Sequence, residues 1–472
     1  MSQPCFARLF LMLAAIGLNA APSLTRSAFA QNNVNAAGIA ADIAIDLQSK
    51  RSAPEGDSAN TKGIHQLFQP SQEAKPAPPP PKLPNALRPQ LFKLLDPDTF
   101  KPLIESKNFV EAQNRITQAE AIPDRTPYEN YILNRMKLSL ASNTNNDQMA
   151  ISAIEAVLAS GKAPPAELGH FQSGLGTYYY NAKNYPKAIE ALKLAQASGN
   201  GSDSVNTALI RAYYLSGDFA SALKAQQPVV EAQEKAGKTP TQEDLRLYAT
   251  AANKVKDNAA YQDALEKLVA YYPNDDYWTD LISRGIVRKP GFSDANILDV
   301  LRLELAAVKQ MQPETYTEMG EQLLRDGFPT EAKKVVDAGF AAGVLGKGAN
   351  AAQHRGLRDR ANKQAADDAK TIASGETNAA RTGTGLVNLG WAYVTMDQFD
   401  KGIPFIERGI AKGGLKSPDE AKLRLGMAYA RAGQKDKAIQ TFETVKAGGG
   451  LADTARYWIL LLNHPNPGGS SA

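Results

Sequence analysis

Apolar residues recur three and four positions apart from about residue 86 to residue 464, and the segments with this spacing come in pairs. One pair covers residues 175–195, LGTYYYNAKNYPKAIEALKLA, and another covers 209–229, LIRAYYLSGDFASALKAQQPV. Such spacing places the apolar side chains on one face of an α-helix. The pattern therefore predicts an all-α chain built of helical hairpins.

The two segments align residue by residue at a distance of 34 positions. Looser copies, or second helices of copies, follow the same order of aromatic, small and apolar residues at 107–119, 147–159, 258–273, 319–339, 389–410 and 425–445. The matched pairs in the two best copies are Leu175 and Leu209, Tyr179 and Tyr213, Tyr185 and Phe219, and Ala188 and Ala222.

Small residues mark the places where two helices are expected to approach closely. Alanine fills this position in second helices, and glycine fills it in first helices of the later copies. The positions are Ala112, Ala150, Ala188, Ala222, Ala264, Gly320, Ala332, Gly390 and Gly426. The spacing between the first five varies from 34 to 42 residues, so an irregular array is expected.

This pattern resembles the tetratricopeptide repeat, a helix-turn-helix unit with a period of 34 residues. The resemblance implies an α-solenoid, an irregular superhelix whose first helices line a concave groove. Stacked neighbours cover the apolar face that one hairpin leaves open. The expected parts are N-terminal repeats (86–273), degenerate helical repeats (274–385), C-terminal repeats with a capping helix (386–464) and a tail (465–472).

Residues 274–312 and 340–385 match the repeat pattern poorly. Residues 340–385 are rich in alanine and polar residues, which indicates one long or broken, weakly packed helix, or alternatively a mobile insertion. The segment LADTARYWILLL (451–462) is expected to cap the last repeat, with Trp458 turned inward.

The first 30 residues have the features of a secretory signal. Arg8 supplies a positive charge, LFLMLAAIGL (9–18) is an apolar run too short to span a bilayer, and AFA (28–30) offers a cleavage site before Gln31. Export to the periplasm, or secretion, is therefore predicted, with an uncleaved membrane anchor as the alternative. The mature chain would contain no spanning helix.

Residues 31–85 are predicted to be a disordered linker that ends in PSQEAKPAPPPPKLP (70–84). Proline fixes φ and lacks an amide donor, so this stretch suits an extended spacer. Alternatively, it is a proline-rich ligand for another protein. Residues 38–47 could form a small docking helix, because Ile39, Ile43 and Leu47 lie four residues apart.

Charge and cysteine content exclude several classes of function. The chain has 53 basic and 49 acidic residues, so no nucleic-acid partner is expected. The single cysteine, Cys5, precedes the apolar run of the signal. The mature chain would therefore have no disulfide, no thiol catalyst and no cysteine metal ligand.

No stretch predicts an enzyme. AQEKAGKT (232–239) loosely matches a phosphate-binding loop, but a helix precedes it and no strand does, so Gly237 is interpreted as a helix stop. The adjacent acids Asp275/Asp276 and Asp367/Asp368 would diverge in a helix. The four histidines stand far apart: His65, His170, His354 and His464. Binding without a cofactor or metal is expected.

The resemblance assigns groove-facing positions in the two best copies. One subtype of the family binds the C-termini of chaperones through Lys, Asn and Arg side chains in the groove. Ser173, Thr177 and Thr207 differ from that set, so the binding of chaperone C-termini is not expected. Tyr180 and Tyr214 with Arg211 could anchor a peptide; alternatively, one tyrosine packs between repeats and Arg211 is solvated. The positions are His170, Ser173, Thr177, Tyr180, Ser204, Thr207, Arg211 and Tyr214.

The sequence therefore predicts a non-catalytic scaffold or adaptor that binds proteins of an envelope or secretion system through the groove. Polysaccharide or peptidoglycan binding is the alternative, since tyrosines and Trp391 could stack on sugars. A hydrolase with a site assembled from distant repeats is a third hypothesis.

Overall fold

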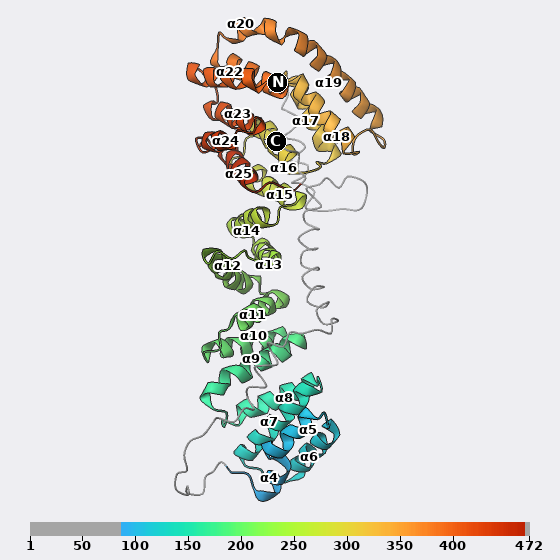
Figure 1. Ribbon diagram of the computed structural model, residues 1–472, viewed down its shortest axis with the longest axis vertical. Helices are drawn as coiled ribbons and strands as arrows, with labels where there is room; N and C mark the ends of the chain where they lie inside the picture. The colour runs from blue at the N-terminus through green and yellow to red at the C-terminus, as the bar shows by residue number, and fades with distance from the viewer. Residues whose placement is uncertain (1–85, 468–472) are drawn as a thin grey trace. The chain divides into compact units, whose positions relative to one another are not determined.

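The computed structural model describes residues 86–467, in which every regular element is a helix (Figure 1). The predicted all-α fold is confirmed for this part of the chain. The predicted signal, the proline-rich linker with its docking helix, and residues 468–472 of the tail lie outside the described residues.

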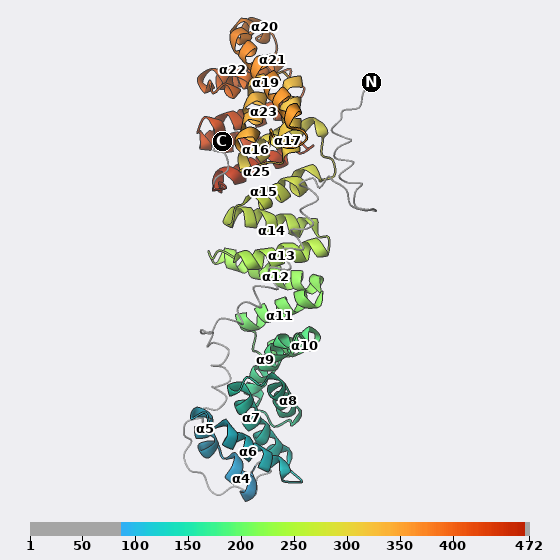
Figure 2. The same ribbon diagram turned by 90° about the vertical axis from the view of Figure 1, so that its right-hand side faces the viewer.

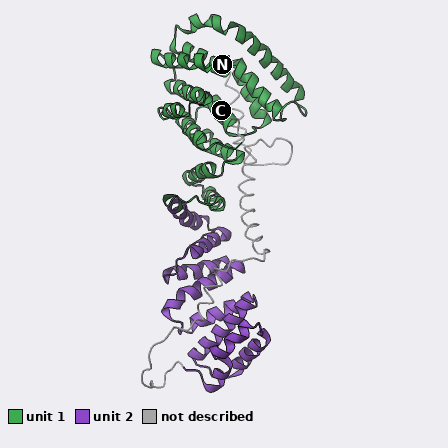
Figure 3. Cartoon of the chain, in the orientation of Figure 1, with its two compact units in different colours: residues 1–45, 233–472 green, residues 46–232 purple. Residues whose placement is uncertain are grey.

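The described chain forms two compact units, residues 86–232 and residues 233–467 (Figure 3). We call them the N-terminal and the C-terminal unit. The helices of the N-terminal unit are α4 (Pro89–Leu95), α5 (Pro97–Glu105), α6 (Phe109–Ala121), α7 (Pro127–Asn143), α8 (Asp147–Ala159), α9 (Pro165–Asn181), α10 (Tyr185–Ala197), α11 (Asp203–Ser216) and α12 (Phe219–Lys235), which ends just past the boundary.

Consecutive helices of the N-terminal unit pack as hairpins, as in α7 with α8 and α9 with α10. The alanines predicted to lie at close approaches are fully buried. Ala112, Ala150, Ala188 and Ala222 each have 0% of their surface exposed. The prediction of helix contacts at small residues is confirmed at these positions.

The turns before α6, α8 and α10 have the same backbone conformation. A residue with positive φ comes two positions before the second helix, and an asparagine follows as the N-cap. Lys107, Asn145 and Lys183 have φ between 52° and 60°, and the side chains of Asn108 and Asn146 accept from the backbone of their helices. The cap satisfies an amide that would otherwise lack a partner.

The helices of the C-terminal unit begin with α13 (Gln242–Lys254), α14 (Asn258–Tyr271) and α15 (Asp275–Ile282), which continues into a π-helical turn (Ser283–Val287). The remaining helices are α16 (Ile297–Ala307), α17 (Pro313–Arg325), α18 (Pro329–Ala341), α19 (Ala351–Thr371), α20 (Glu376–Ala379), α21 (Gly383–Thr395), α22 (Phe399–Lys412), α23 (Pro418–Arg431), α24 (Lys435–Phe442) and α25 (Leu451–Asn463).

A tyrosine near the end of α21 and another near the end of α23 join neighbouring helices in the same way. The hydroxyl of Tyr393 donates to Glu376 of α20, and that of Tyr429 donates to Glu407 of α22. Burial and these hydrogen bonds raise the pKa of both tyrosines to about 12. Tyr179 of α9 repeats the arrangement with Glu155 of α8.

Helices α21 and α22 are in backbone contact through glycines. A Cβ added at Gly390 would lie 2.6 Å from the carbonyl oxygen of Gly402, and one at Gly409 would lie 2.8 Å from that of Gly383. No side chain larger than hydrogen fits at these distances. The predicted close approach at Gly390 is therefore confirmed.

Residues 340–385 contain the long helix α19, which packs against α17 and α18 (Figure 1). Its inner face carries His354, Leu357, Ala361 and Ala365, all buried. The interpretation of this segment as one long helix within the array is confirmed. The buried stripe is narrow and made mostly of small residues, so the apolar pattern of this helix is faint in the sequence.

The last helix returns to the first helices of the same unit. In Figures 1 and 2 α25 lies beside α16, and Trp458 is buried as predicted for a capping helix. Lys289 Nζ lies 2.7 Å from Asp453 Oδ1, and the side chain of Arg456 pairs with Glu266 of α14. These pairs join residues more than 160 positions apart, whereas a repeat array makes mainly nearest-neighbour contacts.

The stretch 232–239 lies at the end of α12, as the sequence predicts. The helix ends at Lys235, and Gly237 follows with φ +69°. The amide of Gly237 donates to the carbonyl of Glu234 at 2.9 Å. This amide is therefore occupied by the chain itself.

The buried carboxyl of Glu304 on α16 is expected to make stability depend on pH. Burial raises its pKa to about 7, above the ordinary 4.5 of the unfolded chain. Between these values the unfolded chain releases this proton and the folded chain keeps it, so stability falls as pH rises from about 4.5 to 7.

Glu304→Gln should therefore raise the free energy of unfolding at pH 8 by about 2–3 kcal/mol and leave it nearly unchanged at about pH 4. Urea unfolding at both pH values measures this difference. Glu314→Gln, at an exposed position of α17, serves as the control. An equal gain at both pH values would contradict the assignment.

Candidate functional site

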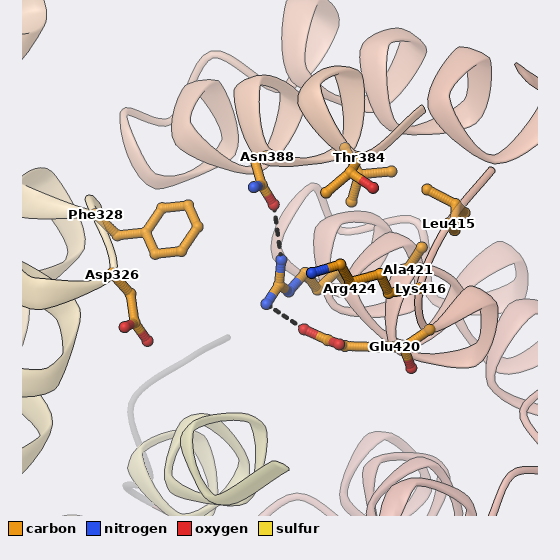
Figure 4. A pocket seen from close by; sticks show the side chains of 11 residues that line it. Asp326, Phe328, Thr384, Asn388, Leu415, Lys416, Glu420, Ala421 and Arg424 are labelled. Carbon is orange, nitrogen blue, oxygen red and sulfur yellow. Dashed lines mark hydrogen bonds and ion pairs between the residues drawn. The ribbon is translucent and has the colours of Figure 1, made fainter. Parts of the chain in front are cut away.

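A pocket of about 320 Å³ opens on the C-terminal unit between the first helices α21 and α23 and the turn before α18 (Figure 4). Its lining combines apolar side chains with hydroxyl, amide and charged groups. The lining residues are Asp326, Phe328, Thr384, Val387, Asn388, Leu415, Lys416, Ser417, Glu420, Ala421 and Arg424. This volume is near the lower end of ligand pockets, which suits a side chain or a short segment of a partner.

Arg424 lies at the centre of the pocket. Its Nη1 donates to Asn388 Oδ1 at 3.1 Å, and its Nη2 donates to Glu420. Its Cζ lies 5.8 Å from the centre of the Phe328 ring, and Figure 4 shows the two side chains pointing toward one another. Contacts from α21, from α23 itself and from the turn before α18 thus fix the orientation of the guanidinium.

A buried ionic cluster lies behind Phe328. Arg302 of α16 donates to both carboxylate oxygens of Glu331 on α18, at 2.9 and 2.8 Å, and also to Asp299. Trp391 Nε1 donates to the same Glu331 carboxylate at 3.0 Å. All four side chains are buried, so α16, α18 and α21 are tied together at one point.

Arg302 also connects the cluster to the pocket wall. Its Cζ lies 5.8 Å from the centre of the Phe328 ring and 4.8 Å from the ring of Trp391. Burial alone would raise the pKa of Glu331, but the charge and hydrogen bonds of Arg302 outweigh it and lower that pKa. Glu331 is therefore a carboxylate that compensates Arg302.

A family model for the tetratricopeptide repeat matches residues 420–447. The chain carries a tetratricopeptide repeat. This repeat consists of α23 and α24, and its first helix supplies Glu420, Ala421 and Arg424 to the pocket. Tetratricopeptide-repeat proteins are protein-binding scaffolds and are typically non-catalytic.

Solved structures with some similarity include a chain of the APC/C hetero-tetramer Cut9–Hcn1, yeast Tom70 and a chain of Naa15/Naa10 bound to HypK-THB. For Cut9–Hcn1 the identity is 10% and the TM-score 0.22, with 67% of this chain and 65% of that chain covered. The chain thus spans slightly under two thirds of the length of that chain.

For yeast Tom70 the identity is 11% and the TM-score 0.21, with 79% of this chain and 95% of that chain covered. For Naa15/Naa10 the values are 14% and 0.18, with 79% and 72% covered. Scores this low carry no argument about arrangement or partners. No curated protein matches the chain.

Within residues 86–467, no helix combines the length and the apolar character needed to cross a bilayer. The same residues hold no group of three His, Cys, Asp or Glu side chains arranged to bind a metal ion. His354, one of the widely spaced histidines, is buried on α19 and accepts from the amide of Gly346 at its Nδ1 (3.1 Å).

The groove positions predicted from the repeat pattern lie on α9 and α11 of the N-terminal unit. His170, Ser204 and Thr207 are exposed. The half-buried Ser173 accepts from Asn200 Nδ2 at 3.0 Å, and Thr177 donates to the carbonyl of Ser173 at 2.9 Å. Ser173 is therefore engaged with the loop that precedes α11.

The two predicted tyrosine anchors differ in their surroundings. Tyr180 is half-buried against the α7–α10 core, and its ring lies 5.8 Å from that of Tyr185. Tyr214 is only 6% exposed and packs edge-on against Phe219 at 5.4 Å. Tyr214 thus contributes packing more than open surface. Arg211 is half-buried on the same helix.

The pocket at Arg424 is not among the residues predicted from the sequence, although the repeat register contains its signal. Thr384 stands five residues before Leu389, as His170 stands five before Leu175. Applying the groove positions of the first copies to the later ones would have selected Thr384 and Glu420. The turn residues of the lining have no such counterpart.

Trp391, which the sequence suggested as a sugar-stacking residue, is 1% exposed. The Cζ atoms of Arg302 and Arg431 lie 4.8 and 5.8 Å from its ring centre, and its Nε1 donates to Glu331. That suggestion is therefore wrong for Trp391, because its surface is already covered by the repeats.

Proposed function

We propose that this protein is a non-catalytic scaffold of the cell envelope that binds segments of partner proteins on the first helices of its tetratricopeptide repeats. The observation that carries the proposal is the open pocket on α21 and α23. Its centre is a fixed arginine with apolar neighbours, which is the composition of protein-interaction hot spots. The predicted positions on α9 and α11 are a second contact area in the same proposal.

An in-cell crosslinking pull-down tests the proposal. Thr384 is exposed at the pocket rim, so Thr384→Arg should obstruct the pocket without disturbing the core. We expect at least one envelope protein to be recovered by the wild type and about tenfold less by this variant. Arg355→Ala, at an exposed position of α19, is the control.

The α9–α11 area is tested in parallel with Tyr180→Ala/Arg211→Ala/Tyr214→Ala, after circular dichroism confirms that the variant is helical. Loss of the partner with this variant alone would place binding on α9 and α11. Failure of the wild type to recover any partner would contradict the scaffold proposal.

Export is the other part of the proposal and is supported by residues 1–30 of the sequence. N-terminal sequencing of the protein from fractionated cells should give a chain that begins at Gln31 in the periplasmic or extracellular fraction. A chain that keeps Met1 and stays in the cytoplasmic fraction would contradict this part.

A further inference from the structure

Acidic and basic side chains line the pocket in equal number. The acids are Asp326 and Glu420, and the cations are Lys416 and Arg424. A charged ligand group of either sign would therefore lie near a like charge as well as an opposite one. Since like charges brought together in an interface cost binding free energy, the lining favours an uncharged ligand group.

Arg424 has more donors than the acceptors around it can use. A guanidinium carries five N–H groups and no acceptor. Two of the five are bonded, since Nη1 donates to Asn388 and Nη2 donates to Glu420. The other three have no acceptor among the described residues, and the one on Nε is buried. Unbonded donors on a side chain that is only 14% exposed favour a ligand that brings an acceptor.

The two partners of Arg424 each keep an unused polar atom. The oxygen of Asn388 faces Arg424, and Figure 4 shows the amide nitrogen turned away from the guanidinium. This nitrogen donates to no atom of the part of the chain that the structure describes. Glu420 accepts from Arg424 at Oε1, which leaves its Oε2 without a donor among residues 86–467. The pocket thus combines unused donors with an unused acceptor.

The apolar part of the lining offers little surface for contact. Phe328, Val387 and Ala421 are 6%, 4% and 4% exposed. A ligand that covers them would remove little apolar area from water, so apolar burial contributes little to binding at this pocket. Hydrogen bonding therefore decides which ligand group the pocket prefers.

The polar positions of the two first helices end within the pocket. One turn after Asn388 and Arg424, the same helix faces carry Ala392 and Ala428. An extended main chain would need donors and acceptors that continue along both helices. Polar groups gathered at one place instead suit a single polar group at the end of a side chain.

We infer that this pocket takes the uncharged amide side chain of a glutamine or an asparagine from a partner segment. The amide oxygen can accept from Arg424 or Asn388, and the amide nitrogen can donate to Oε2 of Glu420. This inference rests on the proposed scaffold function and specifies the chemistry of the partner. Glu420 is the specificity-determining residue, because its carboxylate accepts from an amide and repels a carboxylate of the same size.

Blocked pentapeptides test the inference directly. Acetyl-Ala-Ala-X-Ala-Ala-amide, with X as Gln, Asn, Glu, Met or Ala, is titrated into the full chain and followed by NMR. Glu has the shape of Gln with a charge, Met has a similar length without the amide, and Ala leaves only the main chain. We expect the Gln and Asn peptides to bind at least about tenfold more tightly than the other three, which corresponds to about 1.4 kcal/mol.

Glu420→Gln keeps the size of the side chain and an oxygen for Arg424, but it removes the charge and replaces the unused acceptor with a donor. It should strengthen binding of the Glu peptide about tenfold and weaken binding of the Gln peptide, so that the preference of the wild type is lost. The matched control is Glu443→Gln, because Glu443 is an exposed glutamate of the same repeat outside the pocket. It should change none of the affinities.

Equal or tighter binding of the Glu peptide by the wild type would overturn the inference in favour of a carboxylate ligand. Equal binding of the Met or the Ala peptide would overturn it too, as would a preference for Gln that persists in Glu420→Gln. The pull-down distinguishes the two levels of failure. If Thr384→Arg loses its partner while the peptides show no preference for an amide, the scaffold proposal holds and the amide ligand is wrong.

Discussion

Gly390→Ala is expected to lower the free energy of unfolding of the C-terminal unit by about 3 kcal/mol or more. The new Cβ would lie 2.6 Å from the carbonyl oxygen of Gly402 and 2.8 Å from the amide nitrogen of Ile406. These are backbone atoms of α22, so relief requires α21 and α22 to separate. The loss should exceed the gain in helix propensity that alanine brings.

Gly356→Ala is the matched control, since Gly356 also lies inside a helix, α19. Apart from the backbone of α19 itself, no heavy atom lies within 4 Å of a Cβ added there. At this position the substitution changes only the helix propensity, so alanine should raise the free energy of unfolding by about 0.5–1 kcal/mol. The same substitution thus has opposite signs at the two sites. Urea unfolding followed by circular dichroism measures both.

A Gly390→Ala variant as stable as the wild type would show that the α21–α22 contact can open at little cost. The backbone contact of these two helices would then not be a fixed feature of the repeat. A loss of stability in Gly356→Ala would show that α19 has a partner on its exposed side.

Glu331→Ala is expected to lower the free energy of unfolding by about 3–5 kcal/mol, because it leaves the buried Arg302 with only part of its charge compensation. Trp391 Nε1 would lose its acceptor in the same step. The affinity of the Arg424 pocket should fall too, since Arg302 contacts the Phe328 ring from within the unit.

Replacing all three charged residues of the cluster separates the effect of an uncompensated buried charge on stability from the effect of lost packing. Asp299→Leu/Arg302→Met/Glu331→Met removes all three charges, and its stability should return to within about 2 kcal/mol of the wild type. Asp367→Ala, which breaks an exposed pair with Lys370, should change stability by less than about 0.5 kcal/mol. An equal loss in Glu331→Ala and Asp367→Ala would contradict a role for burial.

Much of the fold could be predicted from the periodicity of the sequence. Hairpins, the close approaches at Ala188 and Gly390, and the inward Trp458 all follow from local patterns that repeat along the chain. The packing of α19 could not, because its buried face is His354, Leu357 and two alanines and gives little contrast in hydrophobicity.

The candidate site was harder to predict for a related reason. The repeat pattern reports which positions face a neighbouring helix, but Phe328 comes from a turn, and its contact with Arg424 joins residues almost 100 positions apart. The buried charges of Asp299, Arg302 and Glu331 likewise come together only in the folded unit. Charged residues in a helical sequence usually lie on the surface, so their burial has no local signature.

The return of α25 to α14 and α16 bears on the order in which the protein can fold as it emerges from the ribosome. Hairpins of the N-terminal unit can complete their contacts soon after they appear. The pairs Arg456–Glu266 and Lys289–Asp453 need the last residues of the described chain, so the early helices of the C-terminal unit must wait for them. A chain that stops before residue 450 would lack α25 and would expose the faces of α14 and α16 that α25 covers, so we expect it to be degraded faster than the full chain.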